Sequence, residues 1–194
     1  MRRKQFMEMP SSEELEKELN RVKYKRRYHV VLRSTVYTLI TVAAIAVLVA
    51  TLWMPVLQIY GGSMTPTLSD GNIVVSVKSG DFQSGDIIAF YYNNKILIKR
   101  VIAGPGDWVN IEEDGTVYVN NERLEEPYLT EKALGECDIE MPYQVPESRL
   151  FVMGDHRSVS VDSRSTAVGC VAEEQIVGRI LFCVWPLKEF GRIE

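Results

Sequence analysis

The longest apolar stretch of the chain lies near its N-terminus, directly after a cluster of basic residues. Residues 34–69 contain no charged side chain, and residues 36–57 form a 22-residue segment that is almost entirely apolar. A helix of this length, at 1.5 Å per residue, can cross a hydrocarbon core of about 30 Å. The pattern therefore predicts a transmembrane helix, which we place within residues 34–57.

A cleavable secretory signal is the competing interpretation of this stretch. Such a signal has an apolar region of only about 7–15 residues and a small-x-small cleavage site. The segment here is longer and lacks that site, so we expect a retained anchor. Residues 1–33 carry ten Lys and Arg against five Glu, whereas the remainder carries twelve basic and twenty-one acidic residues. This asymmetry predicts a single-pass plasma-membrane protein with residues 1–33 in the cytoplasm and residues 58–194 outside it.

A short helix is expected before the membrane segment. Ser11 and Glu14 have the spacing of a capping box, and Leu15, Leu19 and Val22 recur at helical intervals. The other positions are charged, and the apolar seam covers only about two turns. A helix facing solvent or lipid headgroups is therefore favoured over a coiled coil.

Beyond the membrane segment, the pattern changes to short runs rich in β-branched and aromatic residues, separated by turn-forming residues. Asn93-Asn94 between two such runs predicts a tight hairpin. Residues 171–175 suggest a short turn of helix, and residues 121–148 are polar and irregular. The expected fold is mainly β: a transmembrane helix followed by a compact all-β domain of short antiparallel strands. The expected strands are residues 72–78, 86–92, 95–103, 108–112, 116–120, 149–153 and 176–185.

Composition narrows the classes of function. The acidic residues outnumber the basic ones beyond residue 33, so a nucleic-acid-binding surface is not expected. Cys137, Cys170 and Cys183 form no CxxC pair, so no metal site is expected. Cys170 and Cys183 lie in apolar surroundings typical of buried side chains, and the sequence leaves open whether any disulfide forms.

Ser63 lies in the segment Gly-Gly-Ser-Met-Thr-Pro-Thr-Leu, a few residues after the apolar stretch. A serine hydroxyl is a weak nucleophile unless a base removes its proton. The chain has two histidines. His29 is predicted on the other side of the membrane from Ser63, and His156 follows a Gly-Asp pair in a loop, where a supporting role is favoured.

Lys99 is the other available base, because apolar residues surround it on an expected strand. Burial disfavours the ammonium form and would make a neutral amine available near neutral pH. The alternative is that Lys99 and Arg100 point to opposite faces of a sheet and Lys99 reaches out to water. Taken alone, this segment favours the alternative.

A third segment, residues 154–164, concentrates glycine, hydroxyl groups and charge in one loop. Asp162 and Arg164 have a spacing that suits an ion pair holding the loop. Ser160 could bond to Lys99 and fix its direction, as the third member of a catalytic triad does. A plain turn-rich connection is the simpler interpretation, but it does not explain three unusual segments behind one membrane anchor.

Together these segments resemble the bacterial type I signal peptidases of the Ser/Lys kind. The similarity extends from the anchor to Pro186, and the ordered set of motifs is more specific than Ser-Met-x-Pro alone. The matching residues are Ser63-Met64-x-Pro66-Thr67-Leu68, Gly85-Asp86-Ile87, Lys99-Arg100-Val101-Ile102-Ala103-Gly104-x-Gly106-Asp107, Val145-Pro146, Phe151-Val152-Met153-Gly154-Asp155-x-Arg157, Ser160-x-Asp162-Ser163-Arg164, Gly178-Arg179 and Trp185-Pro186.

The resemblance implies a membrane-anchored serine endopeptidase that removes signal peptides from exported preproteins without a metal or cofactor. Ser63 would be the nucleophile, Lys99 the general base and Ser160 the group that orients the lysine. Asp162, Arg164, Arg100 and Asp155 would support the site by ion pairing. An apolar substrate groove would be formed by Leu57, Ile59, Tyr60, Met64, Leu97 and Ile98. Expected partners are signal-peptide-bearing preproteins and the lipid bilayer, with the secretion translocon as a further candidate.

Three positions depart from the family pattern. His156 stands where the family has Asn, Asn72 stands where it usually has Asp, and Gly61 replaces a serine that in some members joins the oxyanion hole. Losing one such donor typically costs about 3 kcal/mol. The glycine and the single anchor resemble members from Gram-positive bacteria.

Three rival functions follow from the same residues. A pilus-assembly chaperone with the peptidase fold would have lost the dyad, but Ser63 and Lys99 are both present. An autoprotease domain of the SOS-repressor type would need a DNA-binding module where this chain has an anchor. A thiol hydrolase using Cys170 and His156 is least favoured, since Cys170 has no activating charge nearby in sequence.

Overall fold

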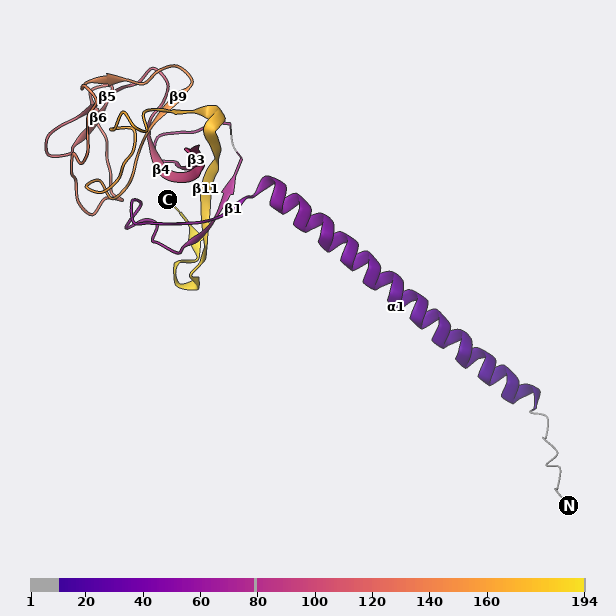
Figure 1. Ribbon diagram of the computed structural model, residues 1–194. Helices are drawn as coiled ribbons and strands as arrows, with labels where there is room; N and C mark the ends of the chain where they lie inside the picture. Colours follow the sequence, from indigo (N-terminus) through magenta and orange to yellow (C-terminus); the bar gives the residue numbers. More distant parts are fainter. Residues whose placement is uncertain (1–10, 79, 194) are drawn as a thin grey trace. The chain divides into compact units, whose positions relative to one another are not determined.

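The computed structural model describes residues 11–78 and 80–193, and it leaves the side chain of Trp53 undescribed. Residues 1–10 of the expected cytoplasmic segment lie outside this range. The chain divides into two compact units, which meet between Val49 and Ala50. The first unit contains most of one long helix, and the second contains all the strands (Figure 1).

Helix α1 runs from Ser12 to Trp53 without a break. Its start has the expected capping box, in which the N–H of Ser11 donates to Glu14 and the N–H of Glu14 donates to Ser11 Oγ. The short helix and the apolar segment, expected as separate elements, are therefore one. The helix ends at Trp53 because Pro55 disfavours helical geometry in the residue before it. Residues 56 and 57, expected at the end of the membrane helix, lie in strand β1 (Val56–Gln58) instead.

By length and composition, α1 could cross a membrane. The stretch from Ser12 to Leu52 has a mean hydropathy of 2.2 in its most apolar window. An apolar helix of this kind fits a membrane anchor.

The strands form two antiparallel sheets, which confirms the mainly β fold (Figure 1). The larger sheet contains β1 (Val56–Gln58), β2 (Ile73–Val77), β3 (Ile87–Tyr92), β4 (Lys95–Ala103), β9 (Arg149–Met153), β10 (Val171–Ala172), β11 (Ile176–Trp185) and β12 (Gly191–Arg192). The smaller contains β5 (Trp108–Ile111), β6 (Val117–Val119), β7 (Glu122–Arg123) and β8 (Tyr143–Gln144). The larger sheet has the order β1-β2-β11-β3-β4-β9-β10, with β12 paired to β11, and the smaller has the order β7-β6-β5-β8.

The hairpin between β3 and β4 turns at Asn93-Asn94, as the sequence predicts. Both asparagines have positive φ angles, 43° and 61°, which suit the two central positions of a type I′ turn. The register of this hairpin places Ile88 opposite Lys99. A two-residue turn thus fixes which residues of β4 face each side of the sheet.

The prediction of a short helix over residues 171–175 was only partly right. Val171 and Ala172 form β10, which pairs with β9, and a 3-10 turn follows at Glu173–Gln175. Val171 is buried and β-branched, so pairing with Leu150 on the sheet is favoured over a helical conformation. A side-chain oxygen of Gln175 accepts the N–H of Ala172 and closes the turn.

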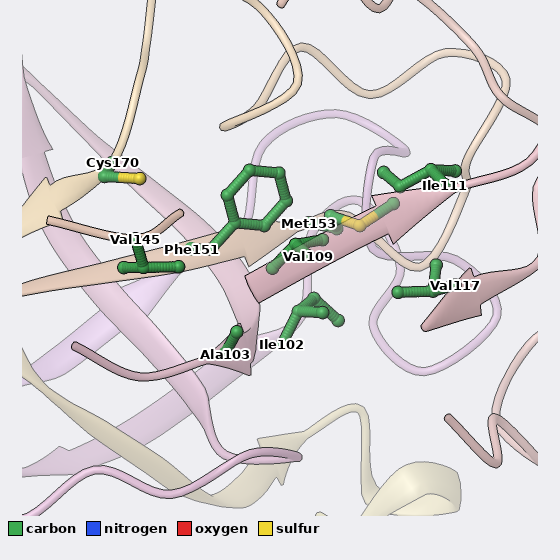
Figure 2. Close-up of a cluster of buried hydrophobic side chains, with 9 residues drawn as sticks. All are labelled: Ile102, Ala103, Val109, Ile111, Val117, Val145, Phe151, Met153 and Cys170. Carbon is green, nitrogen blue, oxygen red and sulfur yellow. The ribbon is translucent and has the colours of Figure 1, made fainter. Parts of the chain in front are cut away.

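Three clusters of buried side chains form the core of the strand domain. Figure 2 shows the cluster in which Phe151 and Met153 of β9 lie with Val109 and Ile111 of β5. This cluster joins the two sheets. Cys170 belongs to it, and all three cysteines are free thiols.

A second cluster lies under the Ser63 segment. Met64 and Leu68 are almost completely buried, and both pack with Val74 of β2. The apolar residues on either side of the turn therefore fix Ser63 to the sheet, which positions the candidate nucleophile.

Candidate active site

Ser63 lies in a turn held by main-chain hydrogen bonds. The N–H of Thr65 donates to the carbonyl of Gly62, and the N–H of Leu68 donates to the carbonyl of Met64. The N–H of His156 donates to the Ser63 carbonyl over 3.1 Å, which joins this turn to the loop of residues 154–164. The two segments that the sequence singled out are thus in direct contact.

Lys99 lies beside Ser63, with 2.7 Å between Lys99 Nζ and Ser63 Oγ. Its side chain is only 3% exposed. Burial lowers the pKa of Lys99, and the nearby Arg164 adds to this effect, while the carboxylates of Asp162 and Asp155 oppose it. The buried environment therefore favours the neutral amine that a general base requires. The sequence left open whether Lys99 is buried or reaches out to water, and in the structure it is buried.

Ser160 is buried close to the same turn. A Cβ on Gly154 would overlap with Ser160 Oγ and lie 2.5 Å from the Ser63 carbonyl oxygen, so only glycine lets these groups approach. The Ser160 hydroxyl has no hydrogen-bond partner among the described residues, so the expected hydrogen bond between Ser160 and Lys99 is not formed in this structure. A buried hydroxyl left unpaired is costly, which makes this one a candidate for a role in the reaction.

Arg100, the neighbour of Lys99 on β4, pairs with Asp155. Its Nε and one terminal nitrogen donate to the two carboxylate oxygens over 2.9 and 2.8 Å, and both side chains are buried. Thr67 Oγ1 also donates to Asp155, over 2.5 Å. The ring of Tyr128 lies 3.9 Å from the Arg100 guanidinium carbon, a cation–π contact. This cluster connects β4 to both active-site loops.

Asp162 and Arg164 form the expected ion pair, with two hydrogen bonds of 2.8 Å. Asp162 also accepts the N–H of Gly154, and Arg164 donates to the carbonyls of Arg157 and Ser160. Both side chains are completely buried, and their hydrogen bonds connect residues of the same loop. The ion pair therefore stabilises the loop that contains Gly154 and Ser160.

One buried ion pair was missed by the sequence reasoning. Arg157 forms a salt bridge with Glu126, and both side chains are completely buried. Arg157 also donates to the carbonyl of Gly154. Arg157 belongs to the matched motif, but Glu126 lies in the irregular region 121–148, where no sequence pattern indicates which side chains are buried.

Ser63 and Lys99 line an apolar groove of about 680 Å³. The six expected groove residues all line it. They come from the Ser63 side (Leu57, Ile59, Tyr60, Met64) and from β4 (Leu97, Ile98). Gln58, Gly61, Asn94, Lys95 and Ile96 line it as well and were not foreseen. Its walls are β1 and the following residues on one side and β4 on the other.

The three departures from the family pattern each have a structural setting. His156 Nδ1 lies 3.0 Å from Thr65 Oγ1. Asn72 is buried, accepts the N–H of Ser69 and donates to Glu189 over 2.9 Å, which an aspartate could not do. The N–H of Gly61 donates to Asp70.

Other candidate groups lie elsewhere. Cys170 is buried in the core, and burial raises the pKa of its thiol, which disfavours the thiolate that a thiol hydrolase needs. His29 lies on α1, in the other unit. Among residues 11–78 and 80–193, no cluster of His, Cys, Asp or Glu could hold a metal ion.

Comparison with known proteins agrees with this site. Residues 32–185 match the model of the signal peptidase family, peptidase S26. Signal peptidase IB of Staphylococcus aureus (strain COL) is 38% identical over 152 residues, which cover 68% of this chain and 78% of that protein. Signal peptidase I of Bacillus licheniformis is 34% identical over 172 residues, which cover 82% of this chain and 91% of that protein.

A crystal structure of a signal peptidase I from Enterococcus faecalis V583 matches with 31% identity and a TM-score of 0.42, over 51% of this chain and 96% of that one. The family match extends from the apolar helix through β11, and so spans the Ser63 turn, β4 and the loop of residues 154–164. The chain therefore belongs to the type I signal peptidases, serine peptidases that remove signal peptides from preproteins.

Proposed function

We propose that this chain is a membrane-anchored signal peptidase that works through a dyad of Ser63 and Lys99. The observation that carries the proposal is the 2.7 Å distance between Lys99 Nζ and Ser63 Oγ, with the lysine almost completely buried. Burial lowers the pKa of Lys99, and a neutral amine at this distance can accept the serine proton.

The first half of the reaction forms an acyl-enzyme. Neutral Lys99 takes the proton of Ser63, and Oγ attacks the scissile carbonyl carbon. The carbonyl electron pair moves to oxygen and returns as the C–N bond breaks. The ammonium of Lys99 gives its proton to the departing amine, which is the N-terminus of the mature protein.

Hydrolysis of the ester follows by the same route. Lys99 takes a proton from water, the hydroxide attacks the acyl carbon, and Ser63 leaves with the proton from Lys99. Ser160, buried next to the Ser63 turn, is proposed to direct the amine toward Ser63. The pairs of Arg100 with Asp155 and of Asp162 with Arg164 hold the two loops around these groups.

The developing oxyanion needs preorganised donors. The backbone N–H of Ser63 is proposed as one of them. Gly61 has no side-chain hydroxyl, and its own N–H donates to Asp70. Any second donor in this chain is therefore a backbone group or water.

The groove suits an extended peptide with small side chains at the first and third positions before the cut. Its walls are apolar, and strand edges on both sides can pair with the main chain of the peptide. The apolar part of α1 is proposed to anchor the enzyme in the membrane that also holds the preprotein, which raises the effective concentration of substrate. The basic excess before it supports a cytoplasmic N-terminus. The lipid bilayer and, during export, the translocon are the further partners proposed.

The test is cleavage of a purified preprotein by the detergent-solubilised full-length chain and its Ser63→Ala and Lys99→Ala variants. Loss of cleavage in both variants, with their circular dichroism unchanged, is the expected result. Equal activity in all three proteins would refute the dyad. Absence of cleavage in the folded wild type, with several preproteins, would instead favour the chaperone alternative.

A further inference from the structure

A second pocket lies next to the Ser63 turn and is distinct from the groove. It has a volume of about 230 Å³, and six of its eight lining residues have polar or charged side chains, although most of the lining surface is apolar. The residues that line it are Thr65, Pro66, Thr130, Glu131, Ala133, Asp155, His156 and Ser158. It shares none of these residues with the apolar groove.

The position of this pocket follows from the turn that separates it from the groove. Ser63 and Met64 line the groove, whereas Thr65 and Pro66 line the second pocket. On its other wall, the N–H of His156 donates to the carbonyl of Ser63, and the imidazole contacts Thr65. Because Thr65 and Pro66 follow Ser63 and Met64 directly, a peptide that fills the groove and continues past Ser63 is inferred to reach the second pocket.

Of the two carboxylates that line the pocket, Glu131 is the one without an ion pair in the described part of the chain. Asp155 is buried and neutralised by its ion pair with Arg100. Glu131 makes no ion pair or hydrogen bond among the described residues, and its neighbour Lys132 is directed to Thr116. The carboxylate of Glu131 is thus free to meet a charge on a bound peptide, among hydroxyl groups that can bond to a polar one.

We propose that the second pocket receives the first residues of the mature protein, those that follow the cut, and that Glu131 makes it select cationic over anionic side chains. The inference rests on the function proposed above, because it needs the cleaved bond to lie at Ser63. The residues before the cut would then bind in the apolar groove, and the residues after it would bind in the second pocket, on the other side of the Ser63 turn.

The experiment compares three peptides that differ only in the first two residues after the cut, which are Lys, Gln or Glu. The full-length enzyme in detergent is used, and kcat/KM is measured at low salt and in 0.5 M NaCl. Since a partly exposed pair of charges contributes roughly 0.2–1 kcal/mol, which is a factor of about 1.4 to 5, we expect the Lys peptide to be cleaved about two- to fivefold faster than the Glu peptide at low salt. Salt should reduce the ratio.

Variants assign the effect to the pocket. In Glu131→Gln the ratio should fall to about one, and in Glu131→Lys it should reverse, while the Gln peptide reports any general loss of activity. Glu147→Gln, at an exposed glutamate outside the pocket, should keep the wild-type ratio.

A wild-type ratio of one, or a ratio that persists in Glu131→Gln, would overturn the inference and leave the proposed function standing. Failure of the wild type to cleave any of the peptides and any preprotein would overturn the proposed function itself. The two failures are therefore distinguishable.

Discussion

Gly154 packs against Ser160 so closely that no side chain fits between them. A Cβ on Gly154 would overlap with Ser160 Oγ and come within 2.5 Å of the carbonyl oxygen of Ser63. The glycine thus sets the spacing between the turn that holds the nucleophile and the loop that holds the buried hydroxyl.

Gly154→Ala is expected to lower kcat about 100-fold or more, because the added methyl group must push the Ser63 turn away from the loop and misplacement by about 1 Å can cost this much. Gly191→Ala is a matched control, since a Cβ there meets nothing within 4 Å. The measurement is preprotein cleavage together with thermal unfolding. Wild-type kcat in Gly154→Ala would contradict the proposed positioning.

Ser160→Ala separates a catalytic role from a structural one. The hydroxyl has no hydrogen-bond partner among the described residues, so its removal should leave the free energy of unfolding unchanged or slightly higher. If Ser160 directs Lys99, kcat should nevertheless fall by about tenfold or more. Rescue by Ser160→Thr would support the role of the hydroxyl, whereas full activity of Ser160→Ala would exclude it.

Lys99→Met should abolish activity and stabilise the fold. Burial lowers the pKa of Lys99 in the folded state, so between that pKa and the ordinary lysine value the unfolded chain binds more protons than the folded one. Wild-type stability therefore rises with pH across this window and is lowest below it. We expect Lys99→Met to be more stable by about 0.5–2 kcal/mol at neutral pH, and the gain to shrink as pH rises.

Urea unfolding of both proteins at several pH values tests this expectation. An equal difference in the free energy of unfolding between the two proteins at every pH would show that titration of Lys99 does not cause the pH dependence of wild-type stability. For the wild type, the same protonation should reduce the cleavage rate as pH falls, because an ammonium group cannot accept the serine proton.

Arg157→Met should destabilise the protein by about 3–5 kcal/mol, because it leaves the buried carboxylate of Glu126 without an ion-pair partner and, among the described residues, with only the hydroxyl of Tyr128 to donate to it. The double variant Arg157→Met/Glu126→Leu should recover most of that loss. Arg192→Met, at an exposed arginine outside the buried pairs, should change stability by no more than about 0.5 kcal/mol. Additive losses in the double variant, measured by urea unfolding, would argue against a coupled pair.

Most strands could be predicted because their residues alternate or form short β-branched runs between turns. β4, β9 and β11 lie where the pattern placed them. The continuity of α1 was missed because the apolar period stops at Val22. The helix continues since no Gly or Pro occurs between Ser12 and Met54, and Lys and Arg are good helix formers.

The candidate site was accessible from the sequence only in part. The motifs around Ser63 and Lys99 carry a strong family resemblance, but the burial of Lys99 depends on packing that no local pattern encodes. Glu126, Tyr128 and Thr67 are far in sequence from the charges they contact, and two of them lie in a region without periodicity. Long-range polar partners of this kind require the folded structure.

The Asn93-Asn94 turn also restricts how this protein can vary. A shift of β4 by one position would put either Arg100 or Ile98 in the place of Lys99. Neither can act as the base, because a guanidinium does not lose its proton and an alkyl side chain has none to exchange. Insertions and deletions at this hairpin that change the register of β4 are therefore expected to inactivate the enzyme, whereas changes absorbed within the turn can leave a working lysine in place.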